Sequence, residues 1–229
     1  MADFAAFEKK IGHTFREPLL LETAFTHRSY LNENRTAGRE HNERLEFLGD
    51  AVLELAVTEF LFAKYPAKPE GELTAYRAAL VNTVSISEAA VKLGINDYLL
   101  LSRGESKDTG RARQIILANA FEALIGALHL DAGYKVAQKF IAEQLFHKTE
   151  EVVSKRLWQD AKSKLQEISQ ERFKVTPKYE VLNQTGPDHD RTFVVGAYIG
   201  EEKVADGEGR SKQEAEQAAA EKALAAKGW

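Results

Sequence analysis

The stretch "NERLEFLGDAVLEL", residues 42–55, places four acidic residues in a segment that is otherwise rich in leucine, valine and phenylalanine. At 3.6 residues per helical turn, the acids fall in a stripe about 80° wide. They are Glu43, Glu46, Asp50 and Glu54. The stripe becomes apolar further along and contains no lysine, although alternating charges are what stabilise an exposed helix face. Two interpretations stay open: a solvated face, or an acidic cluster that faces another element.

A second segment helps to decide between these two interpretations of the acidic stripe. "IILANAFEALIGALHLDAG", residues 115–133, is apolar nearly all round and is predicted to be a buried helix. Between its start and Leu128 the only polar side chains are Asn119 and Glu122, which share a face because they lie three residues apart. A buried carboxylate without a partner is very costly, so Glu122 needs a cation or strong hydrogen-bond donors. One interpretation is a single ion pair, for example with Arg77.

The alternative places Asn119 and Glu122 opposite Glu46 and Asp50 around a divalent metal. An all-oxygen ligand set in a chain without cysteine selects a hard cation such as Mg²⁺ or Mn²⁺. Carboxylate clusters that hold such ions commonly serve phosphoryl transfer, in which the metal activates water and stabilises the leaving oxygen. The pattern therefore points to metal-dependent chemistry on a phosphate ester.

Composition limits the class of protein. The chain has 229 residues, 44% of them hydrophobic, with a net charge of −4 and no cysteine. These values fit a reducing, cytoplasmic setting and exclude a protein that is basic throughout. The start does not resemble a signal peptide, and no uninterrupted apolar run approaches the roughly 18 residues of a membrane span. We expect a soluble protein without a membrane partner.

The hydrophobic spacing changes near residue 150. Residues 1–150 show helical spacing, interrupted by polar segments at 26–43, 64–73 and 101–114. Residues 151–159 are predicted to link them to a second domain at 160–229. That domain is predicted to be α+β in the order α-β-β-β-α.

Its elements are predicted at residues 161–173 (helix), 178–184, 191–200 and 201–207 (strands), and 211–228 (helix). In the last helix Ser211 and Glu214 form a capping box, and Gly228 follows its end.

Five blocks of this sequence, in order, resemble the ribonuclease III family. "ERLEFLGDAVLEL" is similar to the signature of that family. Its other nuclease blocks are matched by "AFTHRSY" (24–30), "PEGELTAYRAALVN" (69–82) and "ILANAFEALIGAL" (116–128). Residues 160–228 resemble its double-stranded-RNA-binding domain. The resemblance covers nearly the whole chain and implies an all-α endonuclease domain at 1–150 followed by the duplex-binding domain.

The resemblance also implies roles for individual acids. It places Glu46, Asp50, Asn119 and Glu122 on the metal ligands. Asp50 and Glu122 match the acids usually treated as catalytic, and the acids with supporting roles match Glu43 and Glu70. Many family members carry aspartate where this chain has Asn119, so this site has one charge fewer, which predicts weaker metal binding with activity retained. We interpret His27, in the "THRSY" block, as structural rather than as a catalytic base.

Phe47 follows Glu46 in the signature and by sequence alone is an ordinary core residue. In the family the equivalent aromatic docks into a second subunit. The resemblance therefore implies a homodimer with two active centres, one for each strand of a duplex.

The second domain offers the three features that reading A-form RNA requires: a polar helix face, a loop, and a helix N-terminus for phosphate. The polar face carries Gln166 and Gln170, and the loop "TGPDHD" (185–190) carries His189. The start of the last helix carries Arg210, Ser211 and Lys212. We expect modest and strongly salt-dependent affinity for double-stranded RNA, because acidic residues flank these positions.

The sequence thus indicates a Mg²⁺-dependent endoribonuclease, in which Mn²⁺ can replace Mg²⁺. As a homodimer it would cut double-stranded RNA to leave 5′-phosphate and 3′-hydroxyl ends. One alternative, motivated by Asn119, is a double-stranded-RNA-binding protein that no longer cleaves. Another is a helical metal enzyme that acts on small phosphate esters.

Overall fold

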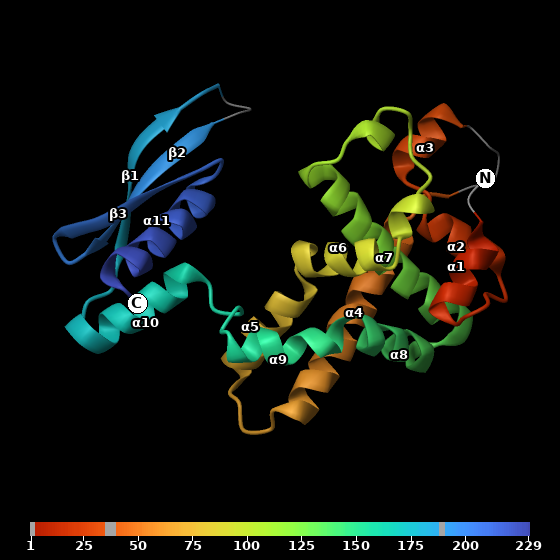
Figure 1. The fold of residues 1–229 in the computed structure, drawn as a ribbon, viewed down its shortest axis with the longest axis horizontal. Helices are drawn as coiled ribbons and strands as arrows, with labels where there is room; N and C mark the ends of the chain where they lie inside the picture. Colours follow the sequence, from red (N-terminus) through yellow and green to blue (C-terminus); the bar gives the residue numbers. More distant parts are fainter. Residues whose placement is uncertain (1–2, 35–39, 188–190) are drawn as a thin grey trace. The chain divides into compact units, whose positions relative to one another are not determined.

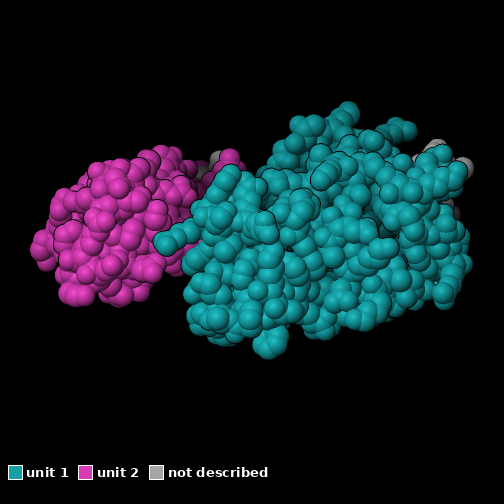
Figure 2. All heavy atoms as spheres, turned by 60° about the horizontal axis from the view of Figure 1, so that its bottom comes forward, with its two compact units in different colours: residues 1–158 teal, residues 159–229 magenta. Residues whose placement is uncertain are grey.

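The computed structural model describes residues 3–34, 40–187 and 191–229. The chain divides into two compact units, Met1–Trp158 and Gln159–Trp229, coloured separately in Figure 2. The first unit is helical and the second is a three-stranded sheet with two helices (Figure 1). This order confirms the predicted fold class.

The first unit consists of helices joined by short turns, with no strand ladder among its described residues. The α-helices are α1 (Phe4–Ile11), α2 (Pro18–Ala24), α3 (Arg28–Glu33), α4 (Glu43–Lys64), α5 (Glu70–Val81), α6 (Thr83–Lys92), α7 (Arg111–Ala132), α8 (Tyr134–Leu145) and α9 (Thr149–Ser154). Three short 3₁₀ helices are η1 (Ile95–Asp97), η2 (Glu105–Lys107) and η3 (Phe146–Lys148).

Helix α7 forms the centre of this unit, in contact with α2, α4, α6 and α8. Its apolar side chains are almost all buried, with Phe121, Leu124 and Ile125 fully inaccessible. By length and composition α7 is apolar enough to cross a membrane, which the sequence analysis did not expect. Because 67% of its apolar window is buried inside the unit, it is the core helix of the domain.

Helices α4 and α7 touch backbone to backbone. A methyl group at Gly49 of α4 would overlap the carbonyl oxygen of Glu122, and one at Gly126 of α7 would overlap that of Leu45. Both glycines are buried. Their lack of a side chain therefore sets how closely the two helices approach, and with it the spacing of the acids on either side.

The polar segment 26–43 is more ordered than the sequence predicts, because it contains α3. His27 caps this helix: the backbone N–H of Ser29 donates to its Nδ1 atom over 3.3 Å. The backbone N–H of His27 donates to the carbonyl of Leu100 over 3.0 Å. Burial lowers the pKa of the His27 imidazole. These contacts fit the structural role predicted for His27.

Residues 149–158 lie with the first unit. Helix α9 contacts α5, and the Trp158 ring packs edge-on against Tyr76 with 5.1 Å between ring centroids. Most of the segment that the sequence analysis treats as a linker is thus folded against the nuclease helices.

The second unit follows the predicted order: α10 (Ala161–Phe173), β1 (Lys178–Thr185), β2 (Thr192–Ile199), β3 (Glu202–Gly209) and α11 (Lys212–Lys227). The strands form an antiparallel sheet in the order β1-β2-β3. Apolar side chains from the strands and from α10 and α11 form one small core. Ser211 caps α11 by accepting from the N–H of Glu214 at 3.1 Å, and Gly228 ends it at φ +67°, as the sequence predicts.

Candidate metal centre and duplex-binding surface

Four oxygen-bearing side chains face one another across the contact between α4 and α7. Helix α4 provides Glu46, which is half-buried, and Asp50, which is exposed. Helix α7 provides Asn119 and Glu122, both half-buried. Asn119 lies close enough to Glu46 for its side chain to lower the pKa of that carboxyl, so the two helices meet at this group. We name these four residues the acid cluster.

The electrostatics of the acid cluster are those of carboxylates that repel one another. The pKa of Glu122 is raised to about 8, first by burial and then by the negative charges of Asp50 and Glu46. The pKa of Glu46 is also raised, by burial and by Glu43 and Asp50, against the opposing effect of the Asn119 hydrogen bond. A cation at this position would relieve the repulsion and lower both pKa values.

The predicted alternative, an ion pair between Glu122 and Arg77, does not form. The Nε atom of Arg77 lies 3.0 Å from Glu54 Oε2, and its Nη1 atom donates to Thr58 Oγ1 over 2.8 Å. Within the described parts of the chain, no lysine, arginine or histidine nitrogen lies within 4.0 Å of the Glu122 carboxylate. Glu54, the last acid of the stripe, therefore joins α4 to α5 through Arg77 and is not part of the acid cluster.

The donors of the acid cluster suit a hard divalent cation, because they are three carboxylates and one amide oxygen. With the side chains as they stand, no three Asp, Glu or His groups of the described residues are gathered tightly enough to hold an ion together. Glu46 and Asp50 nevertheless lie close enough to Glu122 for their charges to raise its pKa, so the donors are neighbours.

The two acids assigned supporting roles lie in different places. Glu43 is at the first turn of α4, where it is exposed and lies 3.5 Å from Arg28 Nη1 and 3.8 Å from His41 Nδ1. Its charge acts on Glu46. Glu70 begins α5, accepts from Thr74 Oγ1 over 3.3 Å, and lines a hollow with Phe62. Glu70 is not among the groups that shift the pKa of Glu46 or Glu122.

Phe47 is not a core residue: 81% of its surface is exposed. It lies at a hollow of about 740 Å³ whose apolar lining includes Leu19, Leu20, Leu48 and Leu130. Leu19 and Leu130 are themselves 50% and 56% exposed. Apolar side chains exposed side by side on one face are typical of a surface that another protein covers.

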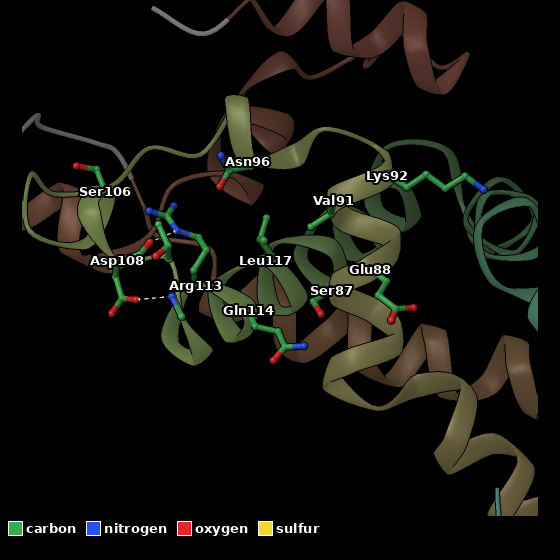
Figure 3. Close-up of a pocket in the computed structure, with 12 residues that line it drawn as sticks. Ser87, Glu88, Val91, Lys92, Asn96, Ser106, Asp108, Arg113, Gln114 and Leu117 are labelled. Atoms are coloured by element: carbon green, nitrogen blue, oxygen red, sulfur yellow. Dashed lines mark hydrogen bonds between the residues drawn. The ribbon is translucent and has the colours of Figure 1, made fainter. Parts of the chain in front are cut away.

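A second hollow, of about 830 Å³, lies between α6 and the start of α7, and no member of the acid cluster lines it (Figure 3). Its lining includes the apolar side chains of Val91 and Leu117. Arg113 holds the adjoining loop by donating to the carbonyls of Glu105 and Asp108 over 2.7 and 3.0 Å. The role of Arg113 could not be predicted from the sequence, since its acceptors are backbone carbonyls of a loop.

The predicted duplex-binding residues of the second unit lie on its surface. Gln166 and Gln170 are exposed on one face of α10, where Gln170 Nε2 donates to Thr176 Oγ1 over 3.2 Å. The start of α11 exposes Arg210, Ser211 and Lys212. His189 lies outside the described residues.

Comparison with known proteins agrees with both units. Residues 17–149 match the family model described as Ribonuclease-III-like, and residues 161–227 match the double-stranded RNA binding motif. The chain is 46% identical over 220 residues to Ribonuclease 3 of Bdellovibrio bacteriovorus, covering 96% of this chain and 94% of that protein. It is 47% identical over 222 residues to Ribonuclease 3 of Bacillus velezensis, covering 97% and 89%.

Among solved structures, the nuclease domain of ribonuclease III from Campylobacter jejuni superimposes with a TM-score of 0.56 and 39% identity, covering 62% of this chain and 98% of that one. That structure is described as showing flexibility in a region involved in dimer formation. These matches agree with the helical first unit, the α-β-β-β-α second unit, and the order of the sequence blocks. The chain therefore belongs to the ribonuclease III family, the double-strand-specific endoribonucleases of RNA processing.

Proposed function

We propose that this endoribonuclease cleaves with Mg²⁺ held by the acid cluster, and that Mn²⁺ substitutes for it. The observation that carries the proposal is Glu122: a half-buried carboxylate whose charged neighbours are other acids. Glu46, Asp50 and Glu122 would supply carboxylate oxygens and Asn119 its amide oxygen. When bound, the metal supplies an activated water and stabilises charge on the leaving oxygen.

The chain's own residues prepare this chemistry. Asp50 and Glu122, the proposed catalytic residues, approach from two helices that Gly49 and Gly126 hold in contact. Because Asn119 is neutral and lowers the pKa of Glu46, it favours the charged form of that carboxylate without adding another negative charge to a repulsive site. Hydrolysis at the 3′ oxygen leaves a 5′-phosphate and a 3′-hydroxyl.

We propose supporting roles for Glu43 and Glu70, each by a different route. Glu43 raises the pKa of Glu46 through space and so adjusts how readily the cluster gives up its proton. Glu70 stands at the positive end of α5, an exposed position from which it can reach an approaching duplex or a second subunit.

The active form proposed here is a homodimer. Phe47 would enter the partner's hollow beside Leu19 and Leu130, which removes three exposed apolar side chains from water. Burying an aromatic side chain of this size contributes roughly 2–3 kcal/mol. Two-fold symmetry would then present two acid clusters, one to each strand.

Duplex RNA is bound, in this proposal, by residues 160–229, and residues 1–150 provide cleavage. Of the predicted linker 151–159, the residues up to Trp158 lie with the nuclease helices. Gln166 and Gln170 would meet a minor groove, and His189 the next one. Arg210, Ser211 and Lys212 would hold phosphates between the grooves, helped by the positive end of α11. We expect the protein to be cytoplasmic and without a membrane partner.

The decisive experiment is cleavage of a long RNA duplex with Mg²⁺ or with EDTA, by the wild type, by Glu122→Gln, and by Glu150→Gln as a matched control. Glu150 is an exposed glutamate on α9, outside the acid cluster. We expect roughly 100-fold or greater loss of cleavage for Glu122→Gln, with duplex binding retained, and no loss for the control.

Each alternative function gives a different result. Duplex binding by the wild type without Mg²⁺-dependent cleavage would identify a non-cleaving binder. Hydrolysis of small phosphate esters without cleavage of RNA would indicate a different enzyme. Near-normal cleavage by Glu122→Gln would show that the acid cluster does not hold the catalytic metal.

A further inference from the structure

Four lysines surround a hollow of about 510 Å³ between α1 and α8, away from every residue assigned a role above. Lys9 and Lys10 come from the last turn of α1, and Lys135 and Lys139 come from one face of α8. His13 also lines the hollow. In Figure 1, α1 and α8 lie in the same helical unit. The two pairs of lysines are about 125 residues apart in the chain, so only the fold brings them together.

Acidic residues do not balance these lysines. Glu143 is the one acidic residue of the described chain that lines the hollow, and its Oε1 atom lies 3.9 Å from Lys139 Nζ. Within the described ranges, no carboxylate lies within 4.0 Å of the Nζ atoms of Lys9, Lys10 or Lys135. Lys135 Nζ instead donates to the neutral Gln138 Oε1 over 3.3 Å, and Lys10 Nζ lies beside Gly94. In a chain with a net charge of −4, this is a concentrated positive surface.

The stability of helices α1 and α8 does not explain why these four lysines lie together. Lys9 and Lys10 favour the negative end of the α1 dipole. Lys135, however, lies in the first turn of α8, where the helix dipole repels a cation. Lys135 and Lys139 are also like charges four residues apart, which costs a few tenths of a kcal/mol. An anion bound in the hollow would attract both lysines. That attraction would offset their repulsion from each other and from the helix dipole.

We propose that this hollow binds an anion that carries several phosphate groups. Lysine ammonium groups are strong phosphate ligands, and residues of the first turn of α8, Lys135 and Val136, line the hollow. The phosphates come either from a free polyphosphate or from a stretch of RNA outside the cleaved segment.

The site is separate from the acid cluster. Leu128 lines the hollow and follows Glu122 by six residues on α7. Six residues advance about 9 Å along a helix and about 240° around it. The two sites therefore lie on different faces of α7, and binding in the hollow does not depend on the proposed metal site.

The first test is isothermal titration of the full-length protein with inorganic tripolyphosphate, in EDTA and about 50 mM salt, where charge screening is modest. We expect Lys135→Gln/Lys139→Gln to bind at least tenfold more weakly than the wild type. The control Lys107→Gln/Lys155→Gln makes the same change of net charge elsewhere on the first unit and should bind like the wild type.

The second test measures binding of an RNA duplex of about 40 base pairs by the same proteins in EDTA. Weaker duplex binding by Lys135→Gln/Lys139→Gln identifies RNA as the source of the phosphates, whereas an effect on tripolyphosphate alone identifies a free anion. If this variant fails to fold by circular dichroism, Lys9→Gln/Lys10→Gln takes its place. Equal affinity of wild type and lysine variant for both probes overturns the proposal.

Discussion

Replacing Glu122 with glutamine should stabilise the metal-free nuclease unit at neutral pH, although it removes a proposed metal ligand. The pKa of Glu122 is about 8 in the folded chain, against 4.5 for an ordinary glutamate. As pH rises above 4.5, the Glu122 carboxyl loses its proton in the unfolded chain but keeps it in the folded chain until about pH 8. Stability is therefore complete below pH 4.5 and is lost as pH rises toward 8.

The size of the effect follows from the shift. Each pH unit inside this window costs up to about 1.4 kcal/mol of the free energy of unfolding. Between pH 5.5 and 7.5 the wild type should lose about 2–3 kcal/mol that Glu122→Gln keeps, because the amide does not titrate. For a unit of this size that corresponds to roughly 5–10 °C in Tm.

The assay is urea unfolding in EDTA at both pH values, followed by helical circular dichroism, for the wild type, Glu122→Gln and the control Glu150→Gln. Only the difference between proteins is interpreted, since other groups titrate in all three. Parallel pH profiles for wild type and Glu122→Gln would refute the burial and repulsion assigned to Glu122. Adding Mg²⁺ at pH 7.5 should raise the Tm of the wild type more than that of Glu122→Gln.

Three further outcomes are expected. Gly126→Val should destabilise the first unit by at least roughly 2–3 kcal/mol in urea unfolding, because the new side chain forces α4 and α7 apart; unchanged stability would contradict the close contact. Phe47→Asp should shift the sedimentation of the protein from dimer to monomer, and an unaltered dimer would place the interface elsewhere. Arg210→Ala and Lys212→Ala should each weaken duplex RNA binding. Each should also reduce by about one the number of ions released on binding, obtained from the slope of affinity against salt concentration.

Local chemistry made much of the second unit predictable. Strand-like runs gave β1, β2 and β3 within two residues of their observed ends. Ser211 and Gly228 marked the ends of α11, because a cap hydroxyl and a left-handed glycine are requirements of the helix itself. On α7, three-residue spacing placed Asn119 and Glu122 on one face without any knowledge of the packing.

Contacts between distant segments were not available from the sequence. Helix α3 lay hidden in a polar segment, since its start depends on His27 docking against Leu100. Phe47 has the composition of a core residue, and only the packing of α4 shows that it points outward.

The sequence by itself determined which residues carry oxygen donors and which helix faces they occupy, because helical periodicity is a local property of the chain. Only the tertiary structure decided that Arg77 binds Glu54 and leaves Glu122 among acids. It also decided that lysines from both ends of the first unit share one hollow. These pairings depend on how closely helices approach, and side-chain volumes at buried contacts such as Gly126 set that distance.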